Sequence, residues 1–141
     1  YLEAREQEHP NYLHSAWEVI TKAPPVGVCA GCHAVGGRPF VAGDPTKVTR
    51  GPDLDRVYSR LQPDWLQIWL YNPKWITPYT RMPQNFTRDK DVFPDLFGGK
   101  GHTQAVASRD ALMNYLRLLE KEGKAVSAAA DQPPGANGGK E

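Results

Sequence analysis

The stretch Cys29-Ala30-Gly31-Cys32-His33 decides how this 141-residue chain is interpreted, because it contains both cysteines of the sequence and a histidine directly after the second. Two residues between the cysteines bring their thiols within reach of two vinyl groups of one porphyrin, and the next residue then offers a nitrogen to the iron. The small residues Ala30 and Gly31 suit the tight turn that this requires. The string therefore predicts covalent attachment of one haem c, with its iron bound by His33.

Two other chemistries use the same cysteine spacing. A thiol redox pair uses Cys-x-x-Cys to lower the pKa of a thiolate, but it has no need of a histidine at the next position. A structural zinc site needs four ligands, and this chain has no second pair of cysteines. Haem attachment is therefore favoured, and a haem-free thiol or metal module is the remaining alternative.

The composition fits one small domain built around a cofactor. With 17 Lys plus Arg against 16 Asp plus Glu, the net charge of +1 gives no support to nucleic-acid binding. Thirteen prolines and 13 glycines predict short helices and long loops. Such a fold needs more than aliphatic packing at its centre, and a large, flat, apolar haem supplies it. No apolar run is long enough to span a membrane.

The chain divides into three regions by composition. Residues 1–10 are charged and without periodicity, which predicts an N-terminal arm. Residues 11–122 form the domain, and residues 123–141, rich in Ala, Pro, Gly and Asn, are expected to be a flexible tail or linker. Because the sequence begins at Tyr1 without Met, we expect a processed or trimmed product whose membrane anchor or neighbouring domain lies outside it.

Three helices are predicted. The first begins at Asn11 or Ser15 and is ended by Pro24-Pro25. The second begins at Pro63 and ends at Asn72-Pro73. Its expected buried face consists of Trp65, Leu66, Ile68, Trp69 and Leu70.

The third predicted helix is capped by Ser108 and stops at Gly123. Its apolar residues recur at i, i+3, i+4 and i+7, namely Leu112, Tyr115, Leu116 and Leu119. Residues 35–52, 77–84 and 86–104 are expected to be loops.

The second axial ligand of the iron decides between an electron carrier and a haem that binds small molecules. The side chains able to supply it are Met82, Met113, His9, His14 and His102. Met82 is preferred because Pro78 and Pro83 restrain its loop, so that a thioether is held in place at little cost to the backbone. His102, in a glycine-rich stretch, is the second candidate.

With these residues assembled, the chain resembles a class I cytochrome c over residues 11–122. Besides the haem string, the likeness rests on Gly51-Pro52-Asp53-Leu54, on Met82-Pro83 and on the segment 111–116. The resemblance implies an all-α cytochrome c fold, in which the Pro52 carbonyl accepts a hydrogen bond from His33 and fixes its orientation. The implied cofactor-binding residues are Cys29, Cys32, His33, Pro52, Leu54 and Met82.

Two features depart from the family pattern. Pro24-Pro25 interrupts the chain between the first helix and the haem string, which leaves the register of the helix pairing open. The segment 83–107 is also long for the family, and we expect it to shield the haem or to meet a partner.

The function expected from these residues is one-electron transfer, not enzymatic catalysis, through a low-spin haem with His33 and Met82 as axial ligands. Its partners are then other redox proteins of a respiratory chain, bound transiently or tethered, in the periplasm or another extracytoplasmic compartment, with membrane association through a missing segment. The alternative is a haem enzyme or gas sensor in which Met82 dissociates from the iron.

Overall fold

A computed structural model of the chain describes residues 1–21, 29–36, 50–86 and 93–121. Within these residues the secondary structure consists of six α-helices and two 3-10 helices, as the all-α prediction requires. They are α1 (Leu2–Glu8), α2 (Tyr12–Thr21), α3 (Val57–Arg60), α4 (Pro63–Tyr71), η1 (Pro73–Trp75), η2 (Phe97–Gly99), α5 (Gly101–Met113) and α6 (Tyr115–Lys121).

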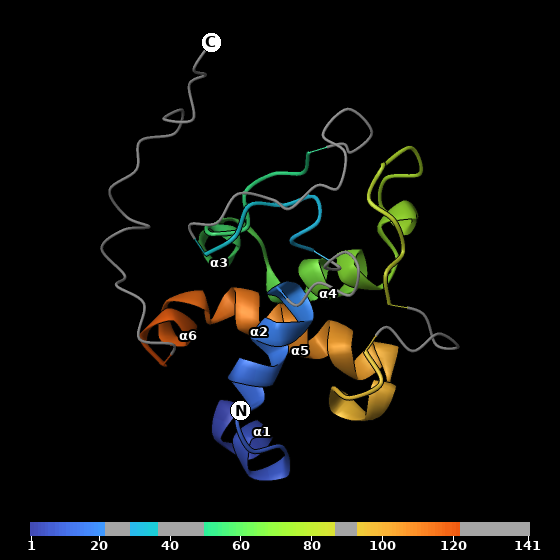
Figure 1. The fold of residues 1–141 in the computed structure, drawn as a ribbon. Helices are drawn as coiled ribbons and strands as arrows, with labels where there is room; N and C mark the ends of the chain where they lie inside the picture. Colours follow the sequence, from blue (N-terminus) through green and yellow to red (C-terminus); the bar gives the residue numbers. More distant parts are fainter. Residues whose placement is uncertain (22–28, 37–49, 87–92, 122–141) are drawn as a thin grey trace.

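The core lies where α2 packs across α5, which is the most extensive contact between helices (Figure 1). Small residues make this close approach possible: Ala16 of α2 and Ala105 and Ala111 of α5 are fully buried. Leu13 and Ile20 fill the space on either side of Ala16. Because the distance between two packed helices depends on the side chains at their contact, alanines let the two backbones approach closely.

Helix α4 begins and ends where its prolines predicted, at Pro63 and just before Asn72-Pro73. It packs on α5 through Leu66 and Leu70, its two buried residues. The predicted buried face was therefore too wide. Trp65 and Ile68 are 38% and 48% exposed, because α4 is covered on one side only.

The predicted arm contains a helix, α1, which packs on α2. A buried carboxylate, Asp110 of α5, binds this end of the chain. It accepts hydrogen bonds from the hydroxyls of Tyr1 (2.8 Å) and Tyr12 (2.7 Å) and pairs with Arg109 at 2.7 Å. Tertiary contact thus stabilises a short helix that has no apolar face of its own.

The last predicted helix is broken in two, and its N-cap is Lys100 rather than Ser108, eight residues earlier than expected. Ser108 does not cap it but lies buried inside α5, where its hydroxyl donates to the Gln104 carbonyl at 2.8 Å. The break falls at Asn114, between α5 and α6. Leu116 of the predicted stripe is 40% exposed, and Leu118 is buried in its place.

Part of the predicted loop 86–104 belongs to η2 and to the first turn of α5. Gln104 fixes this segment: its amide donates to the carbonyls of Phe93 (2.9 Å) and Leu96 (3.0 Å). The predictions on Pro24-Pro25, on most of 35–52, on Gly123 and on the tail lie outside the described residues. In the described part of the chain no helix is long and apolar enough to cross a membrane.

Candidate cofactor site

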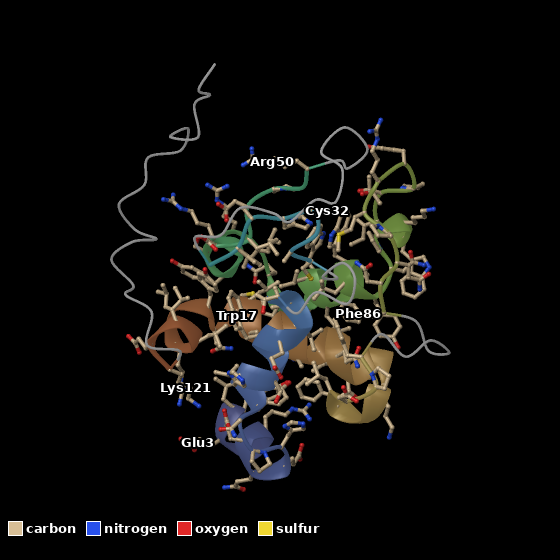
Figure 2. All side chains as sticks on the ribbon, in the orientation of Figure 1. Glu3, Trp17, Cys32, Arg50, Phe86 and Lys121 are labelled. Atoms are coloured by element: carbon tan, nitrogen blue, oxygen red, sulfur yellow. The ribbon has the colours of Figure 1, made fainter. Side chains whose placement is uncertain are left out.

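The haem string forms a tight turn at the end of α2. The amides of Cys32 and His33 both donate to the Cys29 carbonyl, at 3.1 and 2.9 Å. The Ala30 amide donates to the carbonyl of Ile20 at 3.2 Å, which fixes the turn to α2. In Figure 2, Cys32 lies on the side of α2 remote from Glu3 of α1.

Residues 50–55, here called the strap, run beside this turn. The Gly51 amide donates to the Cys32 carbonyl at 2.7 Å, and the Leu54 amide donates to the Ala34 carbonyl at 3.0 Å. These two bonds hold the strap against the backbone on either side of His33. The distance between the His33 backbone and the strap is therefore fixed.

The imidazole of His33 is oriented by the strap. Its Nδ1 lies 2.5 Å from the Pro52 carbonyl oxygen, so Nδ1 donates and the neutral ring keeps Nε2 as its free acceptor. Metal-binding histidines are oriented in this way by a bond from the second ring nitrogen. The resemblance implied this contact, and the structure contains it.

Gly51 is required by the close approach of the His33 ring. A Cβ at position 51 would lie 2.2 Å from Cε1, 2.5 Å from Nδ1 and 2.7 Å from Nε2. All three distances are far below van der Waals contact. A side chain here therefore displaces the imidazole.

The far end of the strap is held by Asp55. Its Oδ1 accepts from the Gly36 amide at 2.7 Å and from the Tyr115 hydroxyl at 2.6 Å. Tyr115 is 1% exposed, and its burial together with the bond to Asp55 raises the pKa of its hydroxyl. The carboxylate thus connects the segment that follows the haem string, the strap and α6.

A cavity of about 540 Å³ opens beside His33, within the size range of cofactor pockets. Both cysteines and His33 line it, as do Pro52 and Leu54 of the strap and Met82. Most of the remaining wall is apolar and comes from α3, α4, α5 and the segment between α3 and α4. Its aliphatic members are Val57, Leu61, Leu66, Leu70 and Leu112.

Met82 is held by two hydrogen bonds. Its amide donates to the Thr80 hydroxyl at 3.2 Å, and its Sδ accepts from the indole Nε1 of Trp69 at 2.9 Å. The side chain is partly buried against the core. A thioether sulfur has two lone pairs, so one remains for a metal.

The other candidate axial ligands do not line the cavity. They are Met113, His9, His14 and His102. Met113 packs partly buried against the core, and the ring of His9 lies against that of Phe97, with centroids 4.6 Å apart and planes inclined by 35°. His102 lies on α5 rather than in a loop, and its Nδ1 is 3.0 Å from the Tyr71 hydroxyl.

Several functional residues were not predicted. Gly51 and Asp55 flank the quoted Pro52 and Leu54, but a glycine and an aspartate in a loop carry no distinctive signal. Trp69 was assigned to packing, since a tryptophan at helical spacing is typical of a core residue. Two further aromatics that follow α4, Trp75 and Tyr79, are 68% and 88% exposed.

The thiol chemistry of the site differs from that of a redox pair. Burial, and to a lesser extent the neighbouring Cys32, raises the pKa of the Cys29 thiol to about 12, whereas reactive cysteine pairs have lowered values. Among the described residues no three His, Cys, Asp or Glu side chains are grouped to hold a metal ion. The site therefore lacks the donor set of a zinc centre.

The residues that line the cavity fit haem c. Two thiols and an oriented imidazole adjoin an apolar cavity that also contains a thioether, which is the donor set of a His/Met haem. Three arginines, Arg50, Arg60 and Arg81, line the same cavity against one acidic residue, Asp53. Their charge suits a ligand with two carboxylates.

Comparison of the chain with models of known protein families and with curated proteins finds no match.

Proposed function

We propose that this chain is a class I c-type cytochrome with one covalently attached haem, which transfers single electrons between redox proteins. The observation that carries the proposal is the shared cavity: Cys29, Cys32, His33 and Met82 all line it. His33 also presents Nε2 because Nδ1 is bound to Pro52. We assign the helices to the cytochrome c fold on the same grounds.

Each residue of the site has a definite role in this proposal. The haem, when attached, supplies an iron that alternates between the ferrous and ferric states. Cys29 and Cys32 would hold the porphyrin as thioethers, and His33 and Met82 would be the two protein ligands of its iron. Methionine is a weak donor that favours ferrous iron, so we expect a reduction potential above that of a bis-histidine haem.

The reaction class follows from the ligand set. With two protein ligands on the iron, no substrate binds there, and only an electron is exchanged. We therefore propose that the partners are redox proteins of a respiratory chain, bound transiently over a small surface or tethered. Covalent haem attachment and the cysteine usage fit an extracytoplasmic location such as the periplasm, with or without a membrane tether.

The test is expression of the full chain together with a c-type haem attachment system. We expect a mass increase of one haem that survives extraction, and a low-spin spectrum in both oxidation states. A colourless protein with two titratable thiols would contradict every part of the proposal.

The ligand assignment is tested by Met82→Ala with Met113→Ala as its matched control, since Met113 is partly buried but does not line the cavity. Met82→Ala is expected to lose the methionine signature of the spectrum, and its reduced form should bind carbon monoxide. Met113→Ala should do neither. Rapid stoichiometric carbon monoxide binding by the unsubstituted protein would instead favour a haem enzyme or gas sensor.

If Met82→Ala keeps the original ligand signature, Met82 is not the ligand. His102→Ala then tests the second candidate. The contact of His102 with Tyr71 on α4 argues against that outcome.

A further inference from the structure

Two tryptophans of α4 form a stacked pair that ends at the Met82 sulfur. Trp65 and Trp69 are four residues apart on one face of the helix, with ring centroids 5.2 Å apart and planes inclined by 11°. Trp69 then donates its Nε1–H to Met82 Sδ at 2.9 Å. Trp65 is 38% exposed, so the series begins at the protein surface.

Packing against α5 does not account for this arrangement, because the residues of α4 that are buried there are Leu66 and Leu70. Both tryptophans instead line the cavity beside His33 and Met82, and Trp65 also reaches solvent. A tryptophan N–H usually finds an oxygen acceptor, and sulfur is a weak one. The pair therefore lies along the wall of the cavity, between solvent and the side chain that the proposed function assigns to the iron.

We propose that Trp65 and Trp69 form an electron-transfer route between the protein surface and the Met82 sulfur. This inference rests on the proposed function. Electronic coupling decays less through overlapping π systems and a hydrogen bond than through solvent or an open gap. The stack and the N–H···S bond therefore favour tunnelling along this series.

The electron balance of the step is simple. A reduced donor at the surface beside Trp65 loses one electron and the ferric iron gains it. No bond forms or breaks and no proton moves. Both indoles remain neutral because they act only as a bridge.

The test uses a photoactive ruthenium polypyridyl complex attached to one introduced cysteine of the haem-loaded chain. Both native thiols are then consumed as thioethers, so Asp64→Cys gives a unique label next to Trp65. Glu120→Cys, on the exposed side of α6, gives a second label as the matched control. Laser excitation reduces the iron from either label, and the rate is read from the haem absorption.

The route is interrupted in two ways. Trp65→Leu removes the surface ring, and Trp69→Phe keeps an aromatic ring but removes the N–H. With the label at position 64, each substitution is expected to slow electron arrival about tenfold. A tenfold change corresponds to about 1.4 kcal/mol in activation free energy. A shifted reduction potential would also change the rate, so the reduction potential and the methionine signature are measured in each variant.

The label at position 120 distinguishes an effect on the tryptophan route from an effect of the substitutions on the haem itself. With the label at position 120, the same substitutions should leave the rate unchanged. The inference is overturned if Trp65→Leu leaves the rate from position 64 unchanged, or if the rate from position 120 falls equally. If the unsubstituted chain attaches no haem, the proposed function fails first, and a free-thiol titration shows this directly.

Discussion

Replacing Gly51 with alanine puts a methyl group into space occupied by the His33 ring, 2.2 Å from its Cε1. Because the Gly51 amide is bound to the Cys32 carbonyl at 2.7 Å, the strap does not move away easily, and the ring must shift. Overpacking of this kind costs about 1 to 3 kcal/mol. Loss of the His33–Pro52 hydrogen bond adds about 1 kcal/mol. We therefore expect Gly51→Ala to lower the free energy of unfolding by about 2 to 4 kcal/mol.

The measurement is urea unfolding of the haem-loaded protein followed by tryptophan fluorescence, with the slope m checked for constancy. The absorption spectrum should change as well, because the displaced ring is the proposed iron ligand. The matched control is Gly98→Ala, where no atom lies within 4 Å of the added methyl group but φ is 62°. Gly98→Ala should lower the free energy of unfolding by about 1 to 2 kcal/mol, because alanine is strained at this φ, and should leave the absorption spectrum unaltered. A loss below about 0.5 kcal/mol in Gly51→Ala, with an unchanged spectrum, would refute the steric argument.

Three further substitutions test the contacts that hold the fold together, one of them at the strap. Tyr115→Phe removes the hydroxyl that donates a hydrogen bond to Asp55 at 2.6 Å. It should lower the free energy of unfolding, measured in urea at neutral pH, by about 1.5 to 3 kcal/mol. The raised pKa of Tyr115 means that its contribution is fully present below the unfolded value of about 10 and is lost as the pH rises above it. The alkaline loss of stability should thus be shallower in the variant, and an identical pH profile would contradict the assignment. Leu13→Ala, at a side chain of α2 that is 1% exposed, should lower the free energy of unfolding by about 2 to 5 kcal/mol, and thermal unfolding decides this. Lys121→Ala breaks a surface ion pair with Glu6 and should cost less than about 1 kcal/mol in the same assay; a larger value would mean that this pair holds α1 in place.

The elements with strong local signals were predictable from the sequence. Prolines mark both ends of α4, and the predicted start of the first helix at Asn11 agrees with α2, which begins at Tyr12. The start of α5 was missed because its buried residues there are Gly101, Gln104 and Ala105, which carry no apolar periodicity. Small and polar residues are buried at this point by the neighbouring segments, which a one-dimensional pattern does not contain.

At the site, too, local sequence signals are predictable and tertiary contacts are not. The haem string is local, so the sequence predicts both cysteines and His33 directly, whereas Pro52 is implied by the family resemblance and Met82 by its proline-flanked loop. The contacts that hold them are not local: Asp55 bonds to Tyr115 across 60 positions, and Trp69 reaches Met82 only through the fold of the intervening loop. Residue types and spacing indicate which groups carry the chemistry, whereas the groups that position them emerge from tertiary structure.

The pairing of α2 with α5 also sets an order of events during synthesis. Its contacts join residues some 90 positions apart, and such non-local closure is a slow step of folding. A chain made from its N-terminus exposes Cys29 and Cys32 well before α5 exists to complete the domain. The Cys29 thiol, which is 4% exposed in the folded chain, is therefore accessible in a chain whose last helices have not yet docked.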